Sequence, residues 1–467
     1  MEFDRRRFLG VAGLAVLGGR AGPGDGPGRE RDWERLRRGL AGRLVLPGDA
    51  DYDRARSPQN TVYAHRRPAA VALCADESDV ARCLEFASAE RLPVAARSGR
   101  HSYAGYSAPQ DGLVVDVAAL DGVRPGAEST VGAGAALIDV YEALGAAGRA
   151  LPAGTCRSVG ISGLALGGGI GVVARKCGLT CDRLLGARVV TPDGSVRVVD
   201  AEHEPDLFWA LRGGGGGNFG VVTSLRFATG PAPDLVPFEL RTPPGAAVDV
   251  LGAWQEWVAD LPDELWSVCR LASGRPPQAV VSGCHVGPPE ALTPLLDRFA
   301  AKVRVLRRDL RPMGYLAAMR HYAGCRGGSC PPPVGTPFAA SSRMLRAPLD
   351  PARAVALLDG ARATALQFDS FGGAISRVGP ADTAFPHRDA LASAQVYVNA
   401  AGVDEARARR EVAVVRDGLG LDTGYVNYID PEMPDWRRAY YGDNHSRLQL
   451  VVRRYDPDRV LAFPQGI

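Results

Sequence analysis

A histidine and a cysteine stand in two glycine-containing turns, where their side chains are available to react. His101 lies in the stretch 97–102 (RSGRHS), in which a predicted strand ends and a polar turn follows. Backbone N–H groups in such a turn can converge on one anion, such as a pyrophosphate. Cys156 lies in the stretch 152–163 (PAGTCRSVGISG), whose glycines let the backbone approach a flat or phosphorylated ligand closely. Taken alone, a histidine in such a turn more often makes a hydrogen bond within its own loop.

Two further glycine-rich stretches extend this pattern. Residues 166–171 (LGGGIG) contain Gly169-x-Gly171-x-x-Ala174, which formally matches the dinucleotide-binding fingerprint. We reject that interpretation because glycines, not a hydrophobic strand, precede the match. Residues 213–217 are five consecutive glycines between a Leu-Phe-Trp segment and a β-branched strand, which is not where a mere linker is expected.

Strands and helices must position these turns. Strand and helix patterns alternate along the chain up to about residue 230, as in an α/β or α+β domain. Prolines then crowd together between 231 and 244, which indicates a change of domain. In the first part we expect strands at 70–74, 92–96 and 112–117, a hairpin at 187–199, and helices capped by Ser78 and at 137–147. In the second part we expect helices at 246–259, 351–366 and 404–419 and a strand at 279–284.

Charge and the N-terminus bear on partners and location. The formal charge of +3 over 467 residues, with no basic run interleaved with aromatics, gives no reason to expect nucleic acid binding. Residues 4–9 (DRRRFL) precede a mildly apolar stretch at 11–19 and resemble a bacterial twin-arginine export signal. That stretch is too short for a membrane span, which needs about 20 residues. We expect export, with transient contact to the export machinery; a basic N-terminus on a cytoplasmic protein is the alternative.

The cysteine content fits an oxidising compartment. Of the nine cysteines, Cys325 and Cys330 are separated by Arg-Gly-Gly-Ser and could close a small loop. If one cysteine serves a cofactor, the other eight could form four disulfides, and free buried thiols are an equal alternative. No C-x-x-C pair occurs, so we expect no zinc and no other metal.

The glycine-rich stretches together resemble the berberine-bridge-enzyme-like FAD-linked oxidases of the vanillyl-alcohol-oxidase superfamily. The motifs are RSGRHS, GTCRSVGISG with LGGGIG, and DLFWALRGGGGGNFG, and the resemblance covers about 60–230 and 370 to the end. It implies an α+β fold, with a two-part FAD-binding domain and a substrate domain whose antiparallel sheet is backed by helices. We accordingly expect a leader at 1–30, FAD-domain segments at 31–230 and 405–467, and the substrate domain at 231–404.

The resemblance also implies how FAD is held. His101 would bond to the 8-methyl carbon of the ring and Cys156 to carbon 6; a single link, with Cys156 free beneath the ring, is the alternative. Arg100 stands where the family usually has glycine, and a positive φ there would cost on the order of 1 kcal/mol or more. The other expected cofactor contacts are Arg97, Ser98, Gly99, Arg100 and Ser102 at the pyrophosphate, Val159, Gly160 and Gly163 along the flavin, Gly220 and Val222 near the adenine end, and Tyr425 and Asn427 beside the ring.

The tail stretch 424–430 (GYVNYID) resembles the family segment that supplies the catalytic base, which would be Tyr428. As Tyr428 takes the hydroxyl proton, hydride would pass to flavin N5; a phenol needs a nearby positive charge or donor for this. Tyr103 and Gln395 match positions that contact the substrate. Ile170 departs from the aromatic residue that several sugar-oxidising members carry, whereas Val159 resembles members that react with O2.

The favoured function is therefore an FAD-dependent oxidase that acts on an alcohol or hemiacetal carbon of a sugar, an oligosaccharide or a glycosylated natural product and produces H2O2. Two alternatives are a dehydrogenase or oxidative-cyclising enzyme of secondary metabolism and, from another class, a flavin-binding protein with little activity. The identity of the substrate and the oligomeric state are left open by the residues alone.

Overall fold

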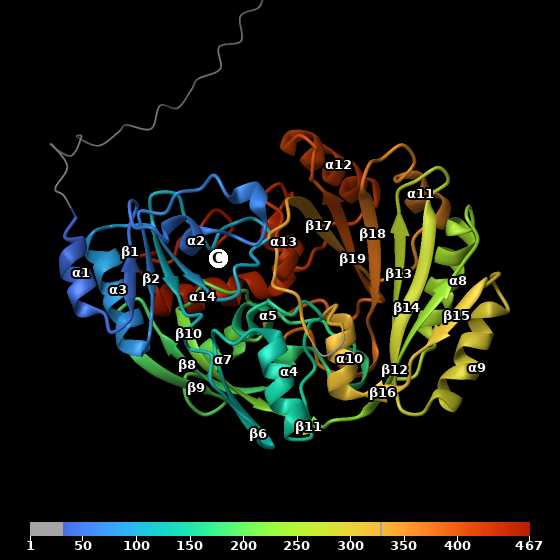
Figure 1. Cartoon of the computed structure of the whole chain (residues 1–467), viewed down its shortest axis with the longest axis horizontal. Coiled ribbons are helices and arrows are strands. Elements are labelled where there is room, and N and C mark those ends of the chain that lie inside the picture. The colour runs from blue at the N-terminus through green and yellow to red at the C-terminus, as the bar shows by residue number, and fades with distance from the viewer. Residues whose placement is uncertain (1–30, 327–328) are drawn as a thin grey trace, which may run out of the picture.

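The computed structural model describes residues 31–326 and 329–467. The expected export signal and leader at 1–30 lie outside the described residues. Figure 1 shows the chain as two parts: a blue-to-green half built on two sheets, and a half built on one large sheet coloured yellow to orange. No described helix combines the length and the apolarity needed to cross a membrane.

The first sheet places the turn that contains His101. Its order is β1-β2-β4-β3, in which β2 and β3 run parallel to β4 and β1 is antiparallel. The helix after β2 begins at Glu77 with Asp76 as its N-cap, not Ser78, because the Asp76 carboxylate accepts the N–H of Asp79. The strand bounds are β1 Arg43–Val45, β2 Ala70–Leu73, β3 Val94–Arg97 and β4 Leu113–Asp116.

The second sheet is antiparallel, in the order β5-β6-β10-β8-β9. The predicted hairpin is confirmed, since β8 and β9 pair around residues 191–195. Strand β10 begins at Val221, and three residues separate it from the five-glycine run, so the sheet holds the end of that run near the cavity described below. The strand bounds are β5 Val123–Arg124, β6 Glu128–Gly132, β8 Leu184–Val190, β9 Val196–Asp200 and β10 Val221–Ala228, and a short ribbon pairs β7 Arg149–Ala150 with β11 Gly230–Pro231.

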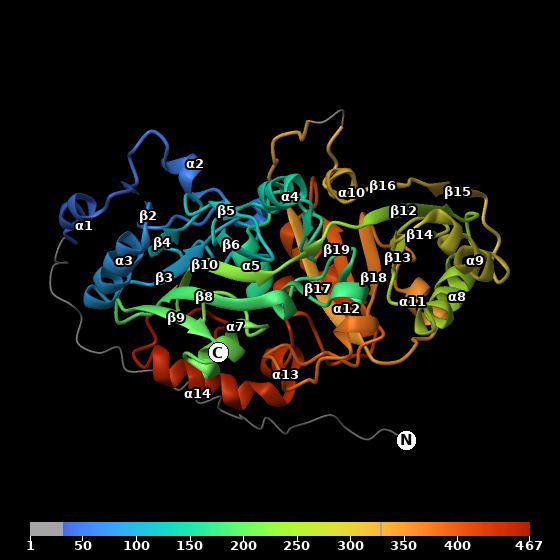
Figure 2. The ribbon, with the colours of Figure 1, turned by 90° about the horizontal axis from the view of Figure 1, so that it is seen from below.

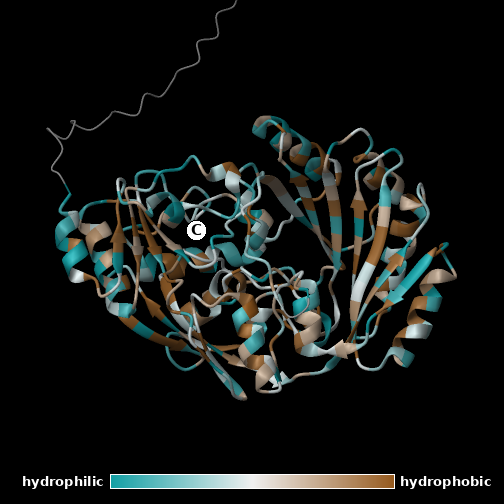
Figure 3. Ribbon diagram, in the orientation of Figure 1, coloured by the Kyte–Doolittle hydropathy of each residue, from teal (hydrophilic) through white to brown (hydrophobic). Residues whose placement is uncertain are grey.

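The large sheet is antiparallel in the order β15-β12-β14-β13-β18-β19-β17, with β16 also on β12. One face packs against α8, α9, α11 and α12, which confirms the expected sheet backed by helices. In Figure 2, α8 and α9 lie at the end farthest from the first half, and Figure 3 shows brown, apolar segments along the strands. The strand bounds are β12 Asp234–Arg241, β13 Leu265–Ala272, β14 Gln278–Val286, β15 Arg307–Leu310, β16 Met313–Gly314, β17 Phe338–Leu345, β18 Thr364–Ser370 and β19 Ala392–Asn399.

The helix predicted at 351–366 is wrong in its second half. Helix α11 covers Pro351–Ala356 and the chain then enters β18 at Thr364. Within this strand, residues 366–369 (LQFD) alternate apolar and polar residues, which is a strand pattern and not a helical one. The helix bounds are α1 Trp33–Gly39, α2 Tyr52–Arg56, α3 Glu77–Ala89, α4 Leu137–Ala146, α5 Ile161–Leu166, α6 Ala174–Cys177, α7 Pro205–Leu211, α8 Ala247–Ala259, α9 Pro289–Ala300, α10 Tyr315–Tyr322, α11 Pro351–Ala356, α12 Glu405–Gly418, α13 Trp436–Tyr441 and α14 His445–Tyr455.

The C-terminal segment 405–467 is shared between the two hydrophobic cores. Helix α12 contributes Ala408 and Val412 to the core of the large sheet. Helices α13 and α14 instead pack into the core of the first half, through residues such as Tyr440 and Leu448. The tail at 424–430 lies between α12 and α13 in the sequence, and its residues line the cavity described below.

Candidate active site

A cavity of about 380 Å³ lies where the first half, the large sheet and the C-terminal tail meet. This size is within the range of small-molecule and cofactor sites. Of the residues predicted for the site, Gln395 does not line the cavity. Those that do are Arg97, Ser98, Gly99, Arg100, His101, Ser102, Tyr103, Cys156, Val159, Gly160, Gly163, Gly220, Val222, Tyr425, Asn427 and Tyr428.

The glycines at the wall leave room for a flat ligand. A Cβ atom added at Gly163 would meet no atom within 4 Å, and one at Gly217 would approach only the Phe463 ring, at 3.9 Å. Both glycines line the cavity, so the space in front of them belongs to it. A side chain at either position would therefore project into the cavity and reduce the space for a ligand.

The turn after β3 is built to receive an anion. The hydroxyl of Ser98 donates to Ala133 O at 2.8 Å, and that of Ser102 accepts the N–H of Tyr106 at 3.0 Å, so both side chains are used within the protein. In the described part of the chain, the backbone N–H groups of 99–102 have no backbone acceptor. These residues line the cavity, and N–H groups in such a turn can converge on one anion, which fits the pyrophosphate of FAD.

The two arginines of this turn differ from expectation in how they are used. Arg97 is buried and its guanidinium pairs with Asp116 at 2.7 Å, so the charge-assisted bond expected from it is committed inside the protein. Arg100 has φ of 66°, so the left-handed conformation does occur at this position, where the family usually has glycine. Its guanidinium donates to Arg54 O at 3.1 Å and lies 3.8 Å from Asp116.

His101 is held as a neutral imidazole. Its Nε2 lies 2.9 Å from Oγ of Ser158, which belongs to the loop that also carries Cys156. Burial lowers the pKa of His101 to about 4. A neutral ring keeps the lone pair that bond formation to carbon requires.

Cys156 has a free thiol that is exposed to the cavity. The protein atoms around the sulfur raise its pKa through burial, while a hydrogen bond with Thr155 and the charge of Arg157 act in the opposite direction. The thiolate is the reactive form of cysteine, so these two neighbours favour reaction at the sulfur.

The other cysteines comprise one disulfide, which the sequence predicted, and several free thiols. Cys325 and Cys330 form a disulfide. The four disulfides considered from the sequence do not form, because every cysteine outside this pair is free. These free cysteines, besides Cys156, are Cys74, Cys83, Cys177, Cys181, Cys269 and Cys284.

Tyr425 and Asn427 organise the wall of the cavity. The hydroxyl of Tyr425 accepts the N–H of Gly169 and the side-chain amide of Asn427, each at 2.8 Å. The same amide donates to Leu164 O at 2.9 Å. These bonds attach the C-terminal tail to the glycine-rich stretch, so they shape the wall even before any ligand is considered.

Tyr428 projects into the cavity beside two other tyrosines. Its ring is stacked on that of Tyr103 and meets that of Tyr425 edge to face, with centroids 5.1 and 5.0 Å away. Burial first, then Tyr103 and Asp369, raise the pKa of Tyr428 well above its ordinary value. The phenol is therefore protonated at neutral pH, and its use as a base requires a positive or electron-poor partner in the filled site.

Asp369 is a site residue that the sequence analysis missed. It lies on β18, lines the cavity and is almost fully buried. Burial raises the pKa of its carboxyl to about 6, while a hydrogen bond from Gln367 acts in the opposite direction. The available signal was the alternation of Gln367 and Asp369 with apolar residues on one strand.

Gln395 reaches the site through a neighbour. It lies on β19, and its side-chain amide donates to the hydroxyl of Tyr103 at 2.6 Å. The ring of Tyr103 also meets Phe338 edge to face, with centroids 5.0 Å apart. Gln395 therefore orients Tyr103 in this structure, whereas direct contact with a substrate stays a prediction.

Two family models match this chain. The FAD binding domain matches residues 68–200, which include both turns that carry His101 and Cys156. The model described as berberine and berberine like matches residues 424–467, which include Tyr425, Asn427 and Tyr428.

Relatives match over nearly the whole length. An uncharacterized FAD-linked oxidoreductase of Bacillus subtilis is 33% identical, over 92% of this chain and 97% of that protein. A chitooligosaccharide oxidase of Gibberella zeae is 31% identical, over 90% and 92% respectively. Among solved structures, the Physcomitrella patens BBE-like 1 protein superposes with a TM-score of 0.86 at 28% identity, covering 93% of this chain and 98% of that one.

Proposed function

Because this chain belongs to the berberine-bridge-enzyme-like family of FAD-linked oxidases, we propose that it carries FAD bound covalently by both His101 and Cys156. We propose further that it oxidises an alcohol or hemiacetal carbon of a sugar or oligosaccharide and passes the electrons to O2. The observation that carries this proposal is the meeting of His101, Cys156 and Tyr428 at one cavity from three separate chain segments.

The residues of the chain have distinct roles in this chemistry. Tyr428 accepts the proton of the substrate hydroxyl, and Tyr103 keeps the Tyr428 ring in place by stacking. Asp369 supplies a carboxylate in the same cavity that can accept a substrate hydrogen bond. Bound FAD would accept the hydride from the same carbon, and O2 would then remove the electrons as H2O2.

A carbohydrate substrate is supported by the relatives and by the cavity. One relative is named a chitooligosaccharide oxidase, another a carbohydrate oxidase of Microdochium nivale, and a third a xylooligosaccharide oxidase of Thermothelomyces thermophilus. The cavity carries polar side chains, such as Gln367 and Asp369, beside aromatic rings. Sugars offer hydroxyl groups to the former and C–H faces to the latter. Val159, which resembles the valine of members that react with O2, lines the cavity, and this supports a reaction with O2 in place of a dehydrogenase reaction.

Export by the twin-arginine route remains part of this proposal. That route carries folded proteins, which suits an enzyme that must acquire its flavin first. The Cys325–Cys330 disulfide is in keeping with an oxidising destination.

Acid denaturation of the purified protein tests the cofactor linkage. Flavin should stay with the precipitated polypeptide of the wild type and of the His101→Ala and Cys156→Ala variants, and should be released only from the double variant. Release from the wild type, or a protein without flavin, would contradict the bicovalent linkage.

A peroxide assay with cello-, xylo- and chito-oligosaccharides tests the reaction. We expect one H2O2 for each sugar oxidised and one O2 consumed. Reduction of the flavin by sugar without uptake of O2 would indicate a dehydrogenase. A flavin that dithionite reduces but no sugar or alcohol reduces would indicate a binding protein with little activity.

A further inference from the structure

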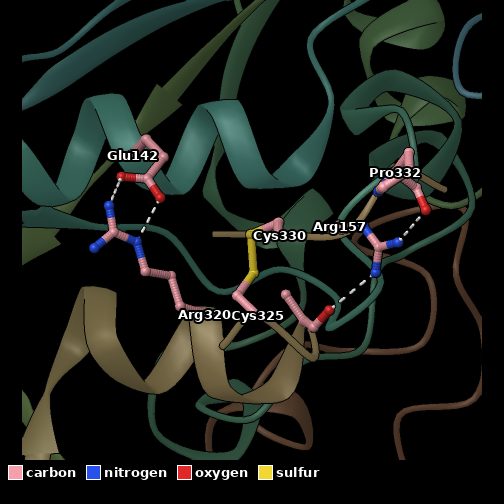
Figure 4. Close-up of a disulfide and its surroundings, with 7 residues drawn as sticks. Glu142, Arg157, Arg320, Cys325, Cys330 and Pro332 are labelled. Carbon is pink, nitrogen blue, oxygen red and sulfur yellow. Dashed lines mark hydrogen bonds and ion pairs between the residues drawn. A yellow bond between two sulfur atoms is a disulfide. The ribbon is translucent and has the colours of Figure 1, made fainter. Parts of the chain in front are cut away.

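A segment of the second half bonds directly to the loop that carries Cys156 and is connected through Gln59 to the loop that carries His101. It runs between α10 and β17 and is described at residues 323–326 and 329–336. The Cys325–Cys330 disulfide closes its first part. We call it the disulfide segment; Figure 4 shows it beside α10 and the loop that contains Arg157.

Arg157, the residue after Cys156, joins the Cys156 loop to this segment. Its Nη1 donates to Ala323 O at 3.2 Å and its Nη2 donates to Pro332 O at 2.9 Å. The two carbonyls lie on either side of the disulfide in the sequence, so one guanidinium binds both ends of the closed loop (Figure 4). Nε of Arg157 is buried without a partner, so these two bonds determine where the guanidinium lies.

The same segment also reaches the His101 loop, through different bonds. Gln59 donates its side-chain amide to Val334 O at 2.6 Å, and its carbonyl accepts the N–H of Thr336 at 2.9 Å. The N–H of Gln59 donates to the carbonyl of Arg100, the residue before His101, at 3.0 Å. The contact with the His101 loop therefore uses a part of the segment outside the disulfide loop.

These contacts lead to an inference that rests on the proposed covalent attachment of FAD. We propose that Arg157, held by the disulfide segment, is a positioning residue that directs the thiol of Cys156 to the flavin ring. The disulfide serves this role by keeping the carbonyls of Ala323 and Pro332 at the spacing that the guanidinium bridges.

The charge of Arg157 supports this role. Burial raises the pKa of the Cys156 thiol, and the neighbouring guanidinium opposes that increase. The titratable groups that also couple to Cys156 are tyrosines, which are neutral near pH 7: Tyr103, Tyr141, Tyr397 and Tyr428. Arg157 is thus the cation that favours the thiolate among these neighbours.

Formation of the bond between the Cys156 sulfur and ring carbon 6 is an oxidation, and O2 can serve as the oxidant. Formation of the carbon–sulfur bond removes the hydrogen of the Cys156 thiol and the hydrogen of ring carbon 6. O2 accepts these two hydrogens with their electrons and becomes H2O2. Because O2 is also the proposed electron acceptor of the enzyme, no further reactant is needed.

The two attachment points allow the test to be selective. In a His101→Ala protein, acid-stable flavin reports only the Cys156 bond, and in a Cys156→Ala protein it reports only the His101 bond. Adding Arg157→Ala should lower acid-stable flavin by at least about tenfold in the first protein, because the loss of even one hydrogen bond to a charged group is enough for a tenfold change, and should leave it unchanged in the second. The Cys325→Ser/Cys330→Ser pair should show the same selectivity.

Two matched variants separate positioning from general stability. Arg157→Lys keeps the charge but cannot span both carbonyls, so it should recover part of the Cys156-linked flavin. Arg320→Gln removes the ion pair between α10 and Glu142, whose Nε–Oε1 distance is 2.6 Å, without touching either loop, so both linkages should persist (Figure 4).

Two other results would overturn the inference. Equal loss in both backgrounds would show that Arg157 supports only the fold, and no loss in either would show that it has no part in the linkage. If His101→Ala alone releases all flavin, the Cys156 bond itself does not exist, and that result is visible before any change at Arg157.

Discussion

The ring of Tyr428 lies parallel to the ring of Tyr103, with centroids 5.1 Å apart and an interplanar angle of 15°. Tyr103 comes from the turn after β3 and Tyr428 from the C-terminal tail, so the pair joins two distant segments at the cavity. Gln395, which lies on β19 of the large sheet, donates a hydrogen bond to the Tyr103 hydroxyl and so connects that sheet to the tyrosine pair. The base that we propose is therefore positioned by all three parts of the fold.

Removal of the Tyr428 hydroxyl should abolish proton transfer and leave the cofactor in place. For Tyr428→Phe we expect kcat to fall by about 10²- to 10⁴-fold, the usual contribution of general base catalysis. The stacking ring and the two proposed attachment residues are retained, so the acid-stable flavin content should equal that of the wild type. Steady-state peroxide assays measure the rate, and a rate within a factor of two of the wild type would exclude Tyr428 as the base.

The buried carboxyl of Asp369 should make stability depend on pH. Its pKa is raised from an ordinary 3.8 to about 6 by burial, so the folded state binds the proton more tightly than the unfolded state. Stability is then highest below the ordinary pKa and is lost as pH rises through 6. Asp369→Asn should therefore increase the free energy of unfolding at pH 8 by up to about 3 kcal/mol and change it little near pH 4. Thermal unfolding at both pH values measures this, and an equal change at both would contradict it.

Arg100 should carry a backbone strain that glycine relieves. Its φ of 66° is in the left-handed region, which costs a residue with a Cβ about 1 kcal/mol. Arg100→Gly and Arg100→Ala both remove the bond to Arg54 O, so their difference isolates the backbone. We expect the glycine variant to be more stable than the alanine variant by about 1 kcal/mol in chemical denaturation. Equal stabilities would mean that the turn relaxes out of this conformation.

Filling the space in front of Gly163 should block the cofactor without disturbing the fold. A Cβ there meets no atom within 4 Å and points into open space at the cavity wall. Gly163→Leu should therefore keep the circular dichroism spectrum of the wild type and lose most of the bound flavin. Gly122→Leu is the matched control, because a Cβ at Gly122 also meets no atom within 4 Å and the residue does not line the cavity. A full flavin content in Gly163→Leu would place the ring elsewhere.

Local patterns predicted several elements correctly. The helix expected at 404–419 forms as Glu405–Gly418, because Asp404 caps it and its apolar residues recur at helical spacing. Local patterns failed where a segment fits both a helix and a strand. At 351–366 the helix ends at Ala356, and β18 begins at Thr364. Asp369 was missed for that reason, since its strand was not recognised.

The amino-acid sequence by itself indicated FAD as the cofactor, because the motifs that contain His101 and Cys156 are short, local stretches that resemble those of a family of FAD-linked oxidases. It also indicated the left-handed position at Arg100 and the Cys325–Cys330 pair, which depend on neighbours a few residues away. Only the tertiary structure decided which charges remain free. The guanidinium of Arg97 is used by Asp116, and that of Arg157 is used by the disulfide segment. Such partners come from distant segments, and the burial that shifts their pKa values exists only once the sheets have packed.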